Sequence, residues 1–341
     1  MKILIPSIQV PFISGGSVLM TNGLKDALIR HGHQVEVVTA PFKFFPESYI
    51  ENLIDFWKKQ DFENFNGHDI DMTISLQFPS YYAQHPNKVL WLMHQHRAVY
   101  ELYNKTDVQK DLKKLKQTIH ENDTKYLSSY KKRFSMSNNV TNRLKRFNNI
   151  DSTPLYHPPY GFENFYNESD YGYIFCPSRL ETLKRQDLLI EAMQYTKTPL
   201  KAIIAGEGGQ KHTYQSLVEK YNLKDKVRLI GHITDEEKYA YYARSLAVFF
   251  APFDEDYGYI TLEAMLSSKP VVTCSDSGGP LEFVIDGETG FITEADPKQI
   301  AEVLDKLYAN KNKAKLLGEN ALQYYISKNI SWDNVVDTLL S

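Results

Sequence analysis

The stretch Ala251-Pro-Phe-Asp-Glu-Asp-Tyr-Gly-Tyr-Ile-Thr-Leu-Glu-Ala-Met265 continues an apolar run at 245–252 and leads into a helix predicted to begin at Gly258. The apolar run is typical of a buried strand. Glu255 and Glu263 stand eight positions apart, one on each side of that glycine. A loop between a buried strand and a helix N-terminus is a natural binding place for a phosphate or a sugar. The stretch therefore predicts a strand–loop–helix unit that carries a ligand at its loop.

The same alternation of strands and helices extends outward along the whole chain, which predicts an α/β fold with parallel sheets. We expect strands at 2–6, 34–39, 72–76, 89–93, 173–176, 201–205, 227–230, 246–250 and 270–274. We expect helices at 17–31, 185–193 and 321–340, and residues 99–135 read as mainly helical and basic. The segment 155–173 has two prolines and no clear period, so it is the best linker candidate.

These elements form two series, each of which reads as a Rossmann-like, doubly wound domain. We expect an N-terminal acceptor domain at 1–165 and a C-terminal donor domain at 166–320, facing each other across a cleft. The remaining residues, 321–341, are expected to form a helix that crosses back to the first domain. A length of 341 residues fits two domains.

The composition excludes several classes of protein. The net charge of −3 argues against a nucleic-acid binder. Both cysteines, Cys176 and Cys274, lie in or beside apolar runs, so buried free thiols are expected. No apolar run approaches the roughly 18 residues of a membrane span, and residues 1–6 read as a strand and not a signal peptide. We therefore expect a cytoplasmic protein.

A basic stretch lies at 105–146, where 12 Lys and Arg residues face four Asp and Glu residues. Two interpretations stay open. The stretch is a solvated helical face, or it contacts anionic lipid at the inner face of a membrane, beside a lipid-linked acceptor.

Three further loops follow predicted strands of the second half. Arg179 and Lys184 lie in the first, where two cations can neutralise a diphosphate, although a solvated charged loop is the other interpretation. Gly206 opens a glycine-rich turn, which lets a ligand approach the backbone closely. Gly278 and Gly279 lie in a third loop of small residues, which we also interpret as facing a ligand.

In the first half, Gly15 and Gly16 precede a helix and are expected to direct backbone N–H groups at an anion. They lack the Gly-x-Gly-x-x-Gly spacing of dinucleotide binders, which counts against a dehydrogenase. His94, His96 and Arg97 follow a strand, where ligands of open α/β sheets bind. No nearby Asp, Glu or Cys completes a two-histidine metal site, so no metal is expected.

Taken in order, these motifs resemble the retaining glycosyltransferases of family four, which have the GT-B fold. The resemblance runs from residue 2 to about residue 337 and is strongest at 173–291. The family's Arg-x4-Lys pair matches Arg179 and Lys184, and its Glu-x7-Glu motif matches Glu255 and Glu263. Its Gly-Gly-x-x-Glu loop matches residues 278–282. One departure is Arg185, where the family usually has glycine.

The resemblance implies a role for each matching residue. Arg179 and Lys184 would bind the donor diphosphate, together with backbone N–H groups of Tyr259 and Ile260 at the helix start. Glu255 would hold hydroxyls of the transferred sugar, and Glu263 would bind the ribose.

On the other side of the expected cleft, Gly16 would lie near the phosphate or the sugar. His94 would lie near the reacting carbon, with His96 and Arg97 as further contacts of the acceptor or phosphate. No metal or other cofactor is implied, because the cations and the helix N-terminus would offset the charge of the leaving group.

The resulting hypothesis is transfer of a sugar, with retention of configuration, from a UDP- or GDP-sugar to a glycan, lipid-linked or other acceptor in surface polysaccharide or glycoconjugate synthesis. A hexosyltransferase is expected. Two alternatives remain: a sugar-nucleotide epimerase of the same fold, and a non-catalytic glycan-binding protein.

Overall fold

The computed structural model describes residues 1–12, 15–103 and 109–341. The chain divides into two compact units, the first formed by Met1–Tyr160 with Ser331–Ser341 and the second by Gly161–Ile330. The division after Tyr160 falls within the expected linker and five residues before the expected end of the first domain. The return to the first unit begins at Ser331, ten residues later than expected.

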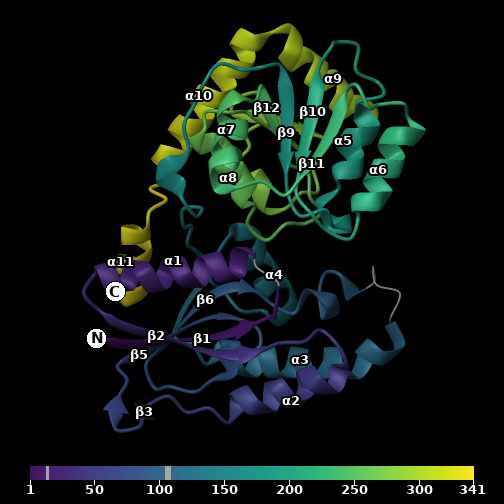
Figure 1. Ribbon diagram of the computed structural model, residues 1–341. Helices are drawn as coiled ribbons and strands as arrows, with labels where there is room; N and C mark the ends of the chain where they lie inside the picture. The colour runs from purple at the N-terminus through teal and green to yellow at the C-terminus, as the bar shows by residue number, and fades with distance from the viewer. Residues whose placement is uncertain (13–14, 104–108) are drawn as a thin grey trace. The chain divides into compact units, whose positions relative to one another are not determined.

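The first unit is built on a six-stranded parallel sheet in the order β2-β1-β5-β6-β7-β8 (Figure 1). Its strands are β1 (Lys2–Gln9), β2 (Gln34–Pro41), β5 (Met72–Gln77), β6 (Lys88–His94), β7 (Lys132–Ser135) and β8 (Thr153–Pro154), with a small hairpin of β3 (Asn64–Phe65) and β4 (His68–Asp69). Its helices are α1 (Gly16–Arg30), α2 (Glu47–Lys58), α3 (Gln109–Ser128), α4 (Asn138–Asn148) and α11 (Trp332–Leu340).

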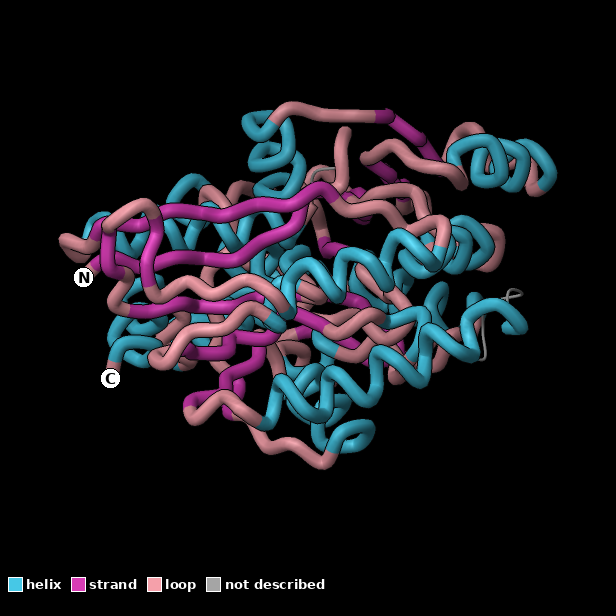
Figure 2. Tube along the Cα trace, turned by 90° about the horizontal axis from the view of Figure 1, so that it is seen from below, coloured by secondary structure: helices cyan, strands magenta, loops and turns pink. Residues whose placement is uncertain are grey.

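Both chain ends belong to this unit (Figure 2). Helix α11 reaches it by packing on α1, where Gly23 leaves room for the indole of Trp332. A Cβ at Gly23 would lie only 2.2 Å from Trp332 Cζ2. The indole ring of Trp332 also packs 5.4 Å from the ring of His157. The predicted helix at 321–340 is therefore two helices, because α10 ends at Ser327 and α11 begins at Trp332.

The prediction that residues 99–135 are mainly helical is wrong at its C-terminal end. Helix α3 ends at Ser128, and Lys132–Ser135 forms strand β7. The local composition is basic and polar, but β7 pairs with the buried strand β6, with Phe134 opposite Trp91. Tertiary pairing with a buried neighbour overrides local propensity here.

The second unit has a six-stranded parallel sheet in the order β11-β10-β9-β12-β13-β14. Its strands are β9 (Tyr173–Pro177), β10 (Lys201–Ala205), β11 (Val227–Gly231), β12 (Ala247–Phe249), β13 (Val271–Cys274) and β14 (Gly290–Thr293). Its α-helices are α5 (Gln186–Ala192), α6 (Lys211–Lys220), α7 (Asp235–Arg244), α8 (Tyr259–Leu266), α9 (Pro297–Ala309) and α10 (Lys311–Ser327). All five strands predicted for this half of the chain are confirmed.

Helices cover both faces of this sheet and bury a separate core on each (Figure 1). One core joins residues of α5, α6 and α9 to the strands, and the other joins residues of α7 and α8. Strands β9, β12 and β13 are fully buried, which explains why they read as short continuous apolar runs. Cys176 and Cys274 are buried free thiols, as predicted.

Candidate functional site

The candidate residues of the second unit gather at the carboxyl ends of four neighbouring strands. The strand order reverses between β9 and β12, and the crevice beyond such a reversal is where open α/β sheets bind their ligands. The loops concerned carry Gly206 after β10, Arg179 and Lys184 after β9, Glu255 and Gly258 after β12, and Gly278 and Gly279 after β13.

Lys184 and Glu255 meet at this edge of the sheet. Lys184 Nζ donates a hydrogen bond of 2.5 Å to Glu255 Oε2, and the two side chains are 18% and 20% exposed. Lys184 ends a short 3-10 helix, η5 (Thr182–Lys184), and Glu255 lies in the loop between β12 and α8. A charge-assisted bond between half-buried partners is stronger than one between neutral groups. The pair therefore joins two loops at the switch point.

The main chain of Glu255 is held by the loop after β13. Glu255 N–H donates to Ser277 O at 2.8 Å, and Gly279 N–H donates to Glu255 O at 2.8 Å. Gly279 opens the 3-10 helix η6 (Gly279–Glu282). The candidate residues of these two loops are thus brought into direct contact.

Helix α8 begins as predicted, directly after Gly258. This glycine has φ +91°, a left-handed conformation that most side chains avoid. A Cβ there would also lie 3.0 Å from Cγ of Pro280. The turn places the backbone of Tyr259 and Ile260 in the first turn of α8. The first N–H groups of an α-helix have no acceptor within the helix itself.

Glu263 projects from α8 to α7 and is 12% exposed on its side chain. Its Oε2 accepts a 2.6 Å hydrogen bond from Tyr242 OH, and its Oε1 lies 3.7 Å from Lys238 Nζ. Burial, and next the nearby Glu263 carboxylate, raise the pKa of Tyr242 well above its ordinary value, so its hydroxyl stays protonated and donates. Glu263 is therefore fixed in one orientation by two side chains of α7.

Gly206 lies where two loops touch. Its φ is +138°, and a Cβ there would lie 1.8 Å from the carbonyl oxygen of Ser178. Gly206 N–H donates to Gly231 O at 2.7 Å, and Ser178 N–H donates to Ala205 O at 3.0 Å. Glycine is required here because the loop after β10 runs against the loop that carries Arg179.

Arg179 differs from Lys184 in its surroundings. Its side chain is exposed, and it makes no ion pair with any residue that the structure describes. Its backbone is anchored, because the carbonyl oxygen of Arg179 accepts a 3.0 Å hydrogen bond from Gln186 Nε2. A fixed backbone with an exposed guanidinium suits the recognition of a planar anion.

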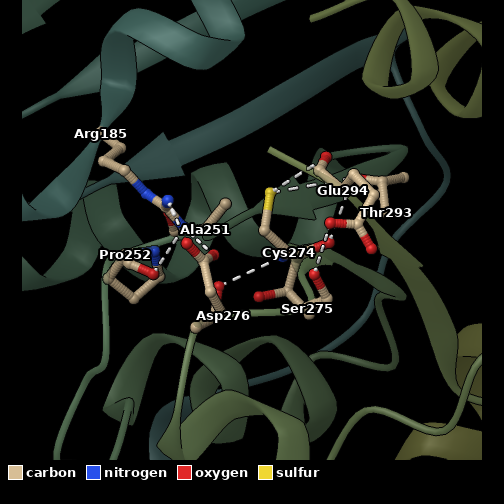
Figure 3. A network of polar contacts seen from close by, with 10 residues as sticks. Arg185, Ala251, Pro252, Cys274, Ser275, Asp276, Thr293 and Glu294 are labelled. Carbon is tan, nitrogen blue, oxygen red and sulfur yellow. Dashed lines mark hydrogen bonds and ion pairs between the residues drawn. The ribbon is translucent and has the colours of Figure 1, made fainter. Parts of the chain in front are cut away.

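Arg185 makes four hydrogen bonds within these loops (Figure 3). Its Nε donates to Ala251 O at 2.7 Å, and its Nη2 donates to Pro252 O at 2.9 Å. Both carboxylate oxygens of Asp276 accept from its guanidinium, at 2.6 and 2.9 Å. Beside this group, Ser275 and Cys274 hydrogen-bond to Glu294.

The candidates of the first unit lie at its own carboxyl strand ends. Gly15 precedes α1 with extended backbone, and a Cβ there would meet nothing within 4 Å. Gly16 is the first residue of α1. His94 ends β6, and its Nδ1 lies 2.8 Å from Gln95 O. A carbonyl only accepts, so Nδ1 carries a hydrogen.

Gln95 is anchored by a buried acid that the sequence analysis did not single out. Asp123 is fully buried and accepts from Gln95 Nε2 at 2.9 Å and from three tyrosine hydroxyls at 2.5–2.9 Å, those of Tyr81, Tyr82 and Tyr100. Burial raises the pKa of Asp123. The network fixes the backbone on which His94 stands.

The neighbours of His94 have other surroundings. His96 packs on the ring of Phe78 with centroids 5.1 Å apart, and burial, with His94 next, lowers the pKa of His96 to about 4. Arg97 Nε donates to Glu101 Oε1 at 2.5 Å. His96 is therefore neutral at pH 7, and Arg97 is held by a carboxylate.

Comparison with known proteins identifies the second unit. The sequence profile described as "Glycosyl transferases group 1" matches residues 162–324, nearly the whole unit. The chain is a glycosyltransferase, and its second unit matches the group 1 family. An uncharacterised glycosyltransferase of Methanocaldococcus jannaschii is 26% identical over 359 residues, covering 98% of this chain and 96% of the relative.

A second relative of this glycosyltransferase has a name that specifies its reaction. The N-acetylgalactosamine-N,N'-diacetylbacillosaminyl-diphospho-undecaprenol 4-alpha-N-acetylgalactosaminyltransferase of Campylobacter jejuni is 30% identical over 171 residues, 45% of this chain and 46% of the relative. The expected resemblance to family four is confirmed, and the chain is an enzyme.

Solved structures show that the glycosyltransferase has the predicted GT-B fold. Sucrose-phosphate synthase from Thermosynechococcus elongatus matches with a TM-score of 0.80 and 18% identity, over 99% of this chain and 98% of that one. The Anabaena protein HepE in complex with UDP and glucose matches with a TM-score of 0.72 and 16% identity, over 100% and 99%.

The described residues of this glycosyltransferase hold no group of three or more His, Cys, Asp or Glu side chains that could bind a metal ion. No helix among them is long and apolar enough to cross a membrane.

Sequence reasoning missed the side chains that hold the candidates in place. The sequence marks Arg185 only as a departure from the family pattern, and no motif marks Asp276. Lys238 and Tyr242 carried no signal beyond their spacing of four on one helix face. No sequence pattern predicts the burial of Asp123, because a carboxylate in a basic helix is typical of an exposed face.

Proposed function

We propose that this enzyme transfers a sugar from a nucleotide-diphosphate donor, with retention of anomeric configuration and without a metal ion. The observation that carries the proposal is the Lys184–Glu255 pair, 2.5 Å apart at the switch point of the second sheet. It puts a cation and a sugar-binding carboxylate side by side, at the start of α8. A nucleotide-sugar donor has a negatively charged diphosphate next to the hydroxyl groups of a sugar. The cation suits the first part of the donor, and the carboxylate suits the second.

The diphosphate is assigned to Arg179, Lys184 and the N-terminus of α8. The exposed guanidinium of Arg179 offers two parallel donors to phosphate oxygens. The ammonium of Lys184 has three hydrogens, so it can keep Glu255 while donating to a phosphate. Backbone N–H groups of Tyr259 and Ile260 add the positive end of the helix dipole. These groups would offset the charge that develops on the leaving group, which supports the proposal of a metal-independent reaction.

The sugar is assigned to Glu255 and the ribose to Glu263. Glu255 has one oxygen on Lys184, which leaves acceptor capacity for sugar hydroxyls. Glu263 has Oε2 bound to Tyr242, and its remaining lone pairs can accept from vicinal hydroxyls. Gly206, Gly278 and Gly279 would let the donor approach the backbone of their loops.

The proposed chemical step needs no protein nucleophile. The bond between the sugar C1 and the diphosphate oxygen breaks, and a bond from the acceptor oxygen to C1 forms on the same face. The hydroxyl proton of the acceptor passes to the leaving phosphate oxygen. Gly15, Gly16 and His94 belong to the first unit, and their part in binding or catalysis is the one that the family resemblance implies.

Two relatives support the choice of substrates. The Anabaena structure holds UDP and glucose, which favours a UDP-sugar over the GDP-sugar that the sequence left open. The name of the Campylobacter relative specifies a diphospho-undecaprenol-linked acceptor, which supports a lipid-linked glycan. An enzyme of the cytoplasm that reaches such an acceptor would touch the membrane surface.

The basic stretch at 105–146 is our candidate for this contact. Its described part includes α3, where Lys116 lies 3.8 Å from the ring centroid of Tyr103 and Lys125 lies 5.5 Å from that of Tyr126. Residues 105–108 of the stretch lie outside the described residues. Salt-sensitive binding to vesicles that contain anionic lipid would support the contact, and no binding at low salt would remove it.

A donor screen with product analysis tests the function. UDP-, GDP- and ADP-sugars are first compared by thermal shift, and the stabilising donor is then incubated with polyprenyl-diphosphate-linked glycans. We expect an acceptor-dependent product with the anomeric configuration of the donor and a rate that EDTA leaves unchanged. A donor altered in the absence of acceptor would indicate the epimerase, and an inverted product would contradict retention.

A further inference from the structure

Arg185 stands in an unusual backbone conformation for its residue type. It lies between η5 and α5 with φ +52° and ψ +43°, in the left-handed region. Residues other than glycine are uncommon there, and such an outlier persists only where its surroundings hold it. The side chain of Arg185 is 15% exposed, so this conformation directs a cation inward among the loops.

The contacts of this guanidinium bridge three loops. The loop after β9 (residues 178–185) carries Arg185 itself. The loop after β12 (residues 250–258) supplies two acceptors, Ala251 O and Pro252 O, and the loop after β13 (residues 275–278) supplies the carboxylate of Asp276 (Figure 3). The four hydrogen bonds span 2.6–2.9 Å and use all three guanidinium nitrogens.

Each of the three loops is tied to the Lys184–Glu255 pair. Arg185 follows Lys184 directly, and the two carbonyls that it binds lie three and four residues before Glu255. Asp276 O accepts from Asp254 N–H at 2.9 Å, and Ser277 O accepts from Glu255 N–H at 2.8 Å. The position of both members of the pair therefore depends on the loops that Arg185 joins.

We propose that Arg185, held by Asp276, is a positioning residue that sets the Lys184–Glu255 geometry and so tunes the affinity for the donor. The inference rests on the proposed function, because it takes the pair as the donor site. A lysine cannot replace the arginine, since one ammonium group cannot reproduce a fork that binds a carboxylate and two carbonyls together.

The test uses Arg185→Gly, Arg185→Lys and Asp276→Asn in the full chain. Glycine adopts this backbone conformation without strain, so Arg185→Gly removes the side-chain contacts and leaves the turn intact. We expect a rise in KM for the donor and a fall in kcat/KM of about 10- to 100-fold in Arg185→Gly and Arg185→Lys. KM for the acceptor should stay unchanged. Arg244→Ala is the control, because Arg244 makes an exposed ion pair with Glu168 in the same unit.

Two readouts separate positioning from a structural role. A loss of folded protein would lower kcat and leave the donor KM at its wild-type value, which would overturn the proposal. Guanidinium ion at non-denaturing concentration should partly restore Arg185→Gly and should not restore Lys184→Ala. If Arg185→Gly fails to fold, Asp276→Asn carries the test, and a wild-type donor KM in that variant overturns the proposal. An inactive wild-type enzyme would instead contradict the proposed function.

Discussion

Lys184 Nζ lies 2.5 Å from Glu255 Oε2, although 71 residues separate the two in the chain. Lys184 belongs to the Arg-x4-Lys pair, and Glu255 is the first glutamate of the Glu-x7-Glu motif. The family resemblance implies that they bind different parts of the donor, and no sequence pattern predicts their contact. If Lys184 binds the diphosphate and Glu255 binds the sugar, as proposed, then one hydrogen-bonded pair holds both parts of the donor.

The pair should act as a unit in catalysis. Lys184→Ala and Glu255→Ala are each expected to lower kcat/KM by about 100-fold, since each removes a charge directed at the donor. The double variant should lose less than the product of the two losses, because contacting residues are not additive. Steady-state kinetics of the two single variants and the double variant measure this. Lys224→Ala, which breaks an exposed ion pair with Glu219, is the control.

The Tyr242 hydroxyl should contribute more to nucleotide binding than to the stability of the fold. Tyr242→Phe keeps the buried ring and removes only the hydroxyl that donates to Glu263. We expect a loss of about 1 kcal/mol of stability and a several-fold weaker binding of the nucleoside diphosphate. Calorimetric titration of UDP into both proteins checks the second point. Tyr214→Phe is the matched control, since the buried Tyr214 hydroxyl bonds to the backbone, with Glu181 O at 3.5 Å. Equal weakening in both variants would disprove the assignment of Glu263 to the ribose.

Gly206 should tolerate no side chain. Gly206→Ala would force a methyl group against Ser178 O and strain a left-handed backbone, so we expect a loss of about 2–4 kcal/mol in the free energy of unfolding. Gly209→Ala is the control, because the nearest atom to its Cβ is Glu181 Oε2 at 3.8 Å. Urea denaturation of the two variants gives the comparison. A Gly206→Ala variant as stable as Gly209→Ala would mean that the loops are not packed as described.

His157 should make the first unit less stable in acid. Burial lowers the pKa of His157 to about 3 in the folded protein, against 6.5 for an ordinary histidine. Between these two values the unfolded chain binds a proton that the folded chain does not. The free energy of unfolding therefore falls as the pH drops below about 6.5, by up to roughly 1.4 kcal/mol per pH unit.

His157→Phe removes this titration and keeps an aromatic ring between Trp91 and Trp332. The variant should show a flatter dependence of its stability on pH between 6.5 and 4 than the wild type, whatever its stability at pH 7. Denaturation midpoints at pH 7, 6 and 5 measure both slopes. Parallel curves would show that His157 takes up its proton to the same extent in the folded and unfolded states, which would contradict the lowered pKa.

The fold could be predicted from the sequence because its strands are short, apolar and regularly separated by helices. The start of α8 was predicted because Gly258 interrupts the pattern at a strand–helix junction. Strand β7 was missed because Lys132-Arg133-Phe134-Ser135 gains its strand conformation from pairing with β6, which no local pattern records.

The site could be predicted only for residues that lie in a recognisable spacing. Arg179, Lys184, Glu255 and Glu263 belong to such spacings, and the structure brings them to one edge of one sheet. Arg185, Asp276 and Tyr242 act through contacts between residues 21 to 91 positions apart, and sequence distance hides such contacts.

The most direct test of the account is calorimetric titration of nucleotide-diphosphate sugars into the wild-type enzyme, Lys184→Ala and Lys224→Ala. The account predicts that one UDP-sugar binds the wild type and Lys224→Ala equally, and binds Lys184→Ala at least about 10-fold more weakly, the cost of one charge-assisted hydrogen bond. Equal binding by all three proteins, or no binding of any such donor by the wild type, would contradict it.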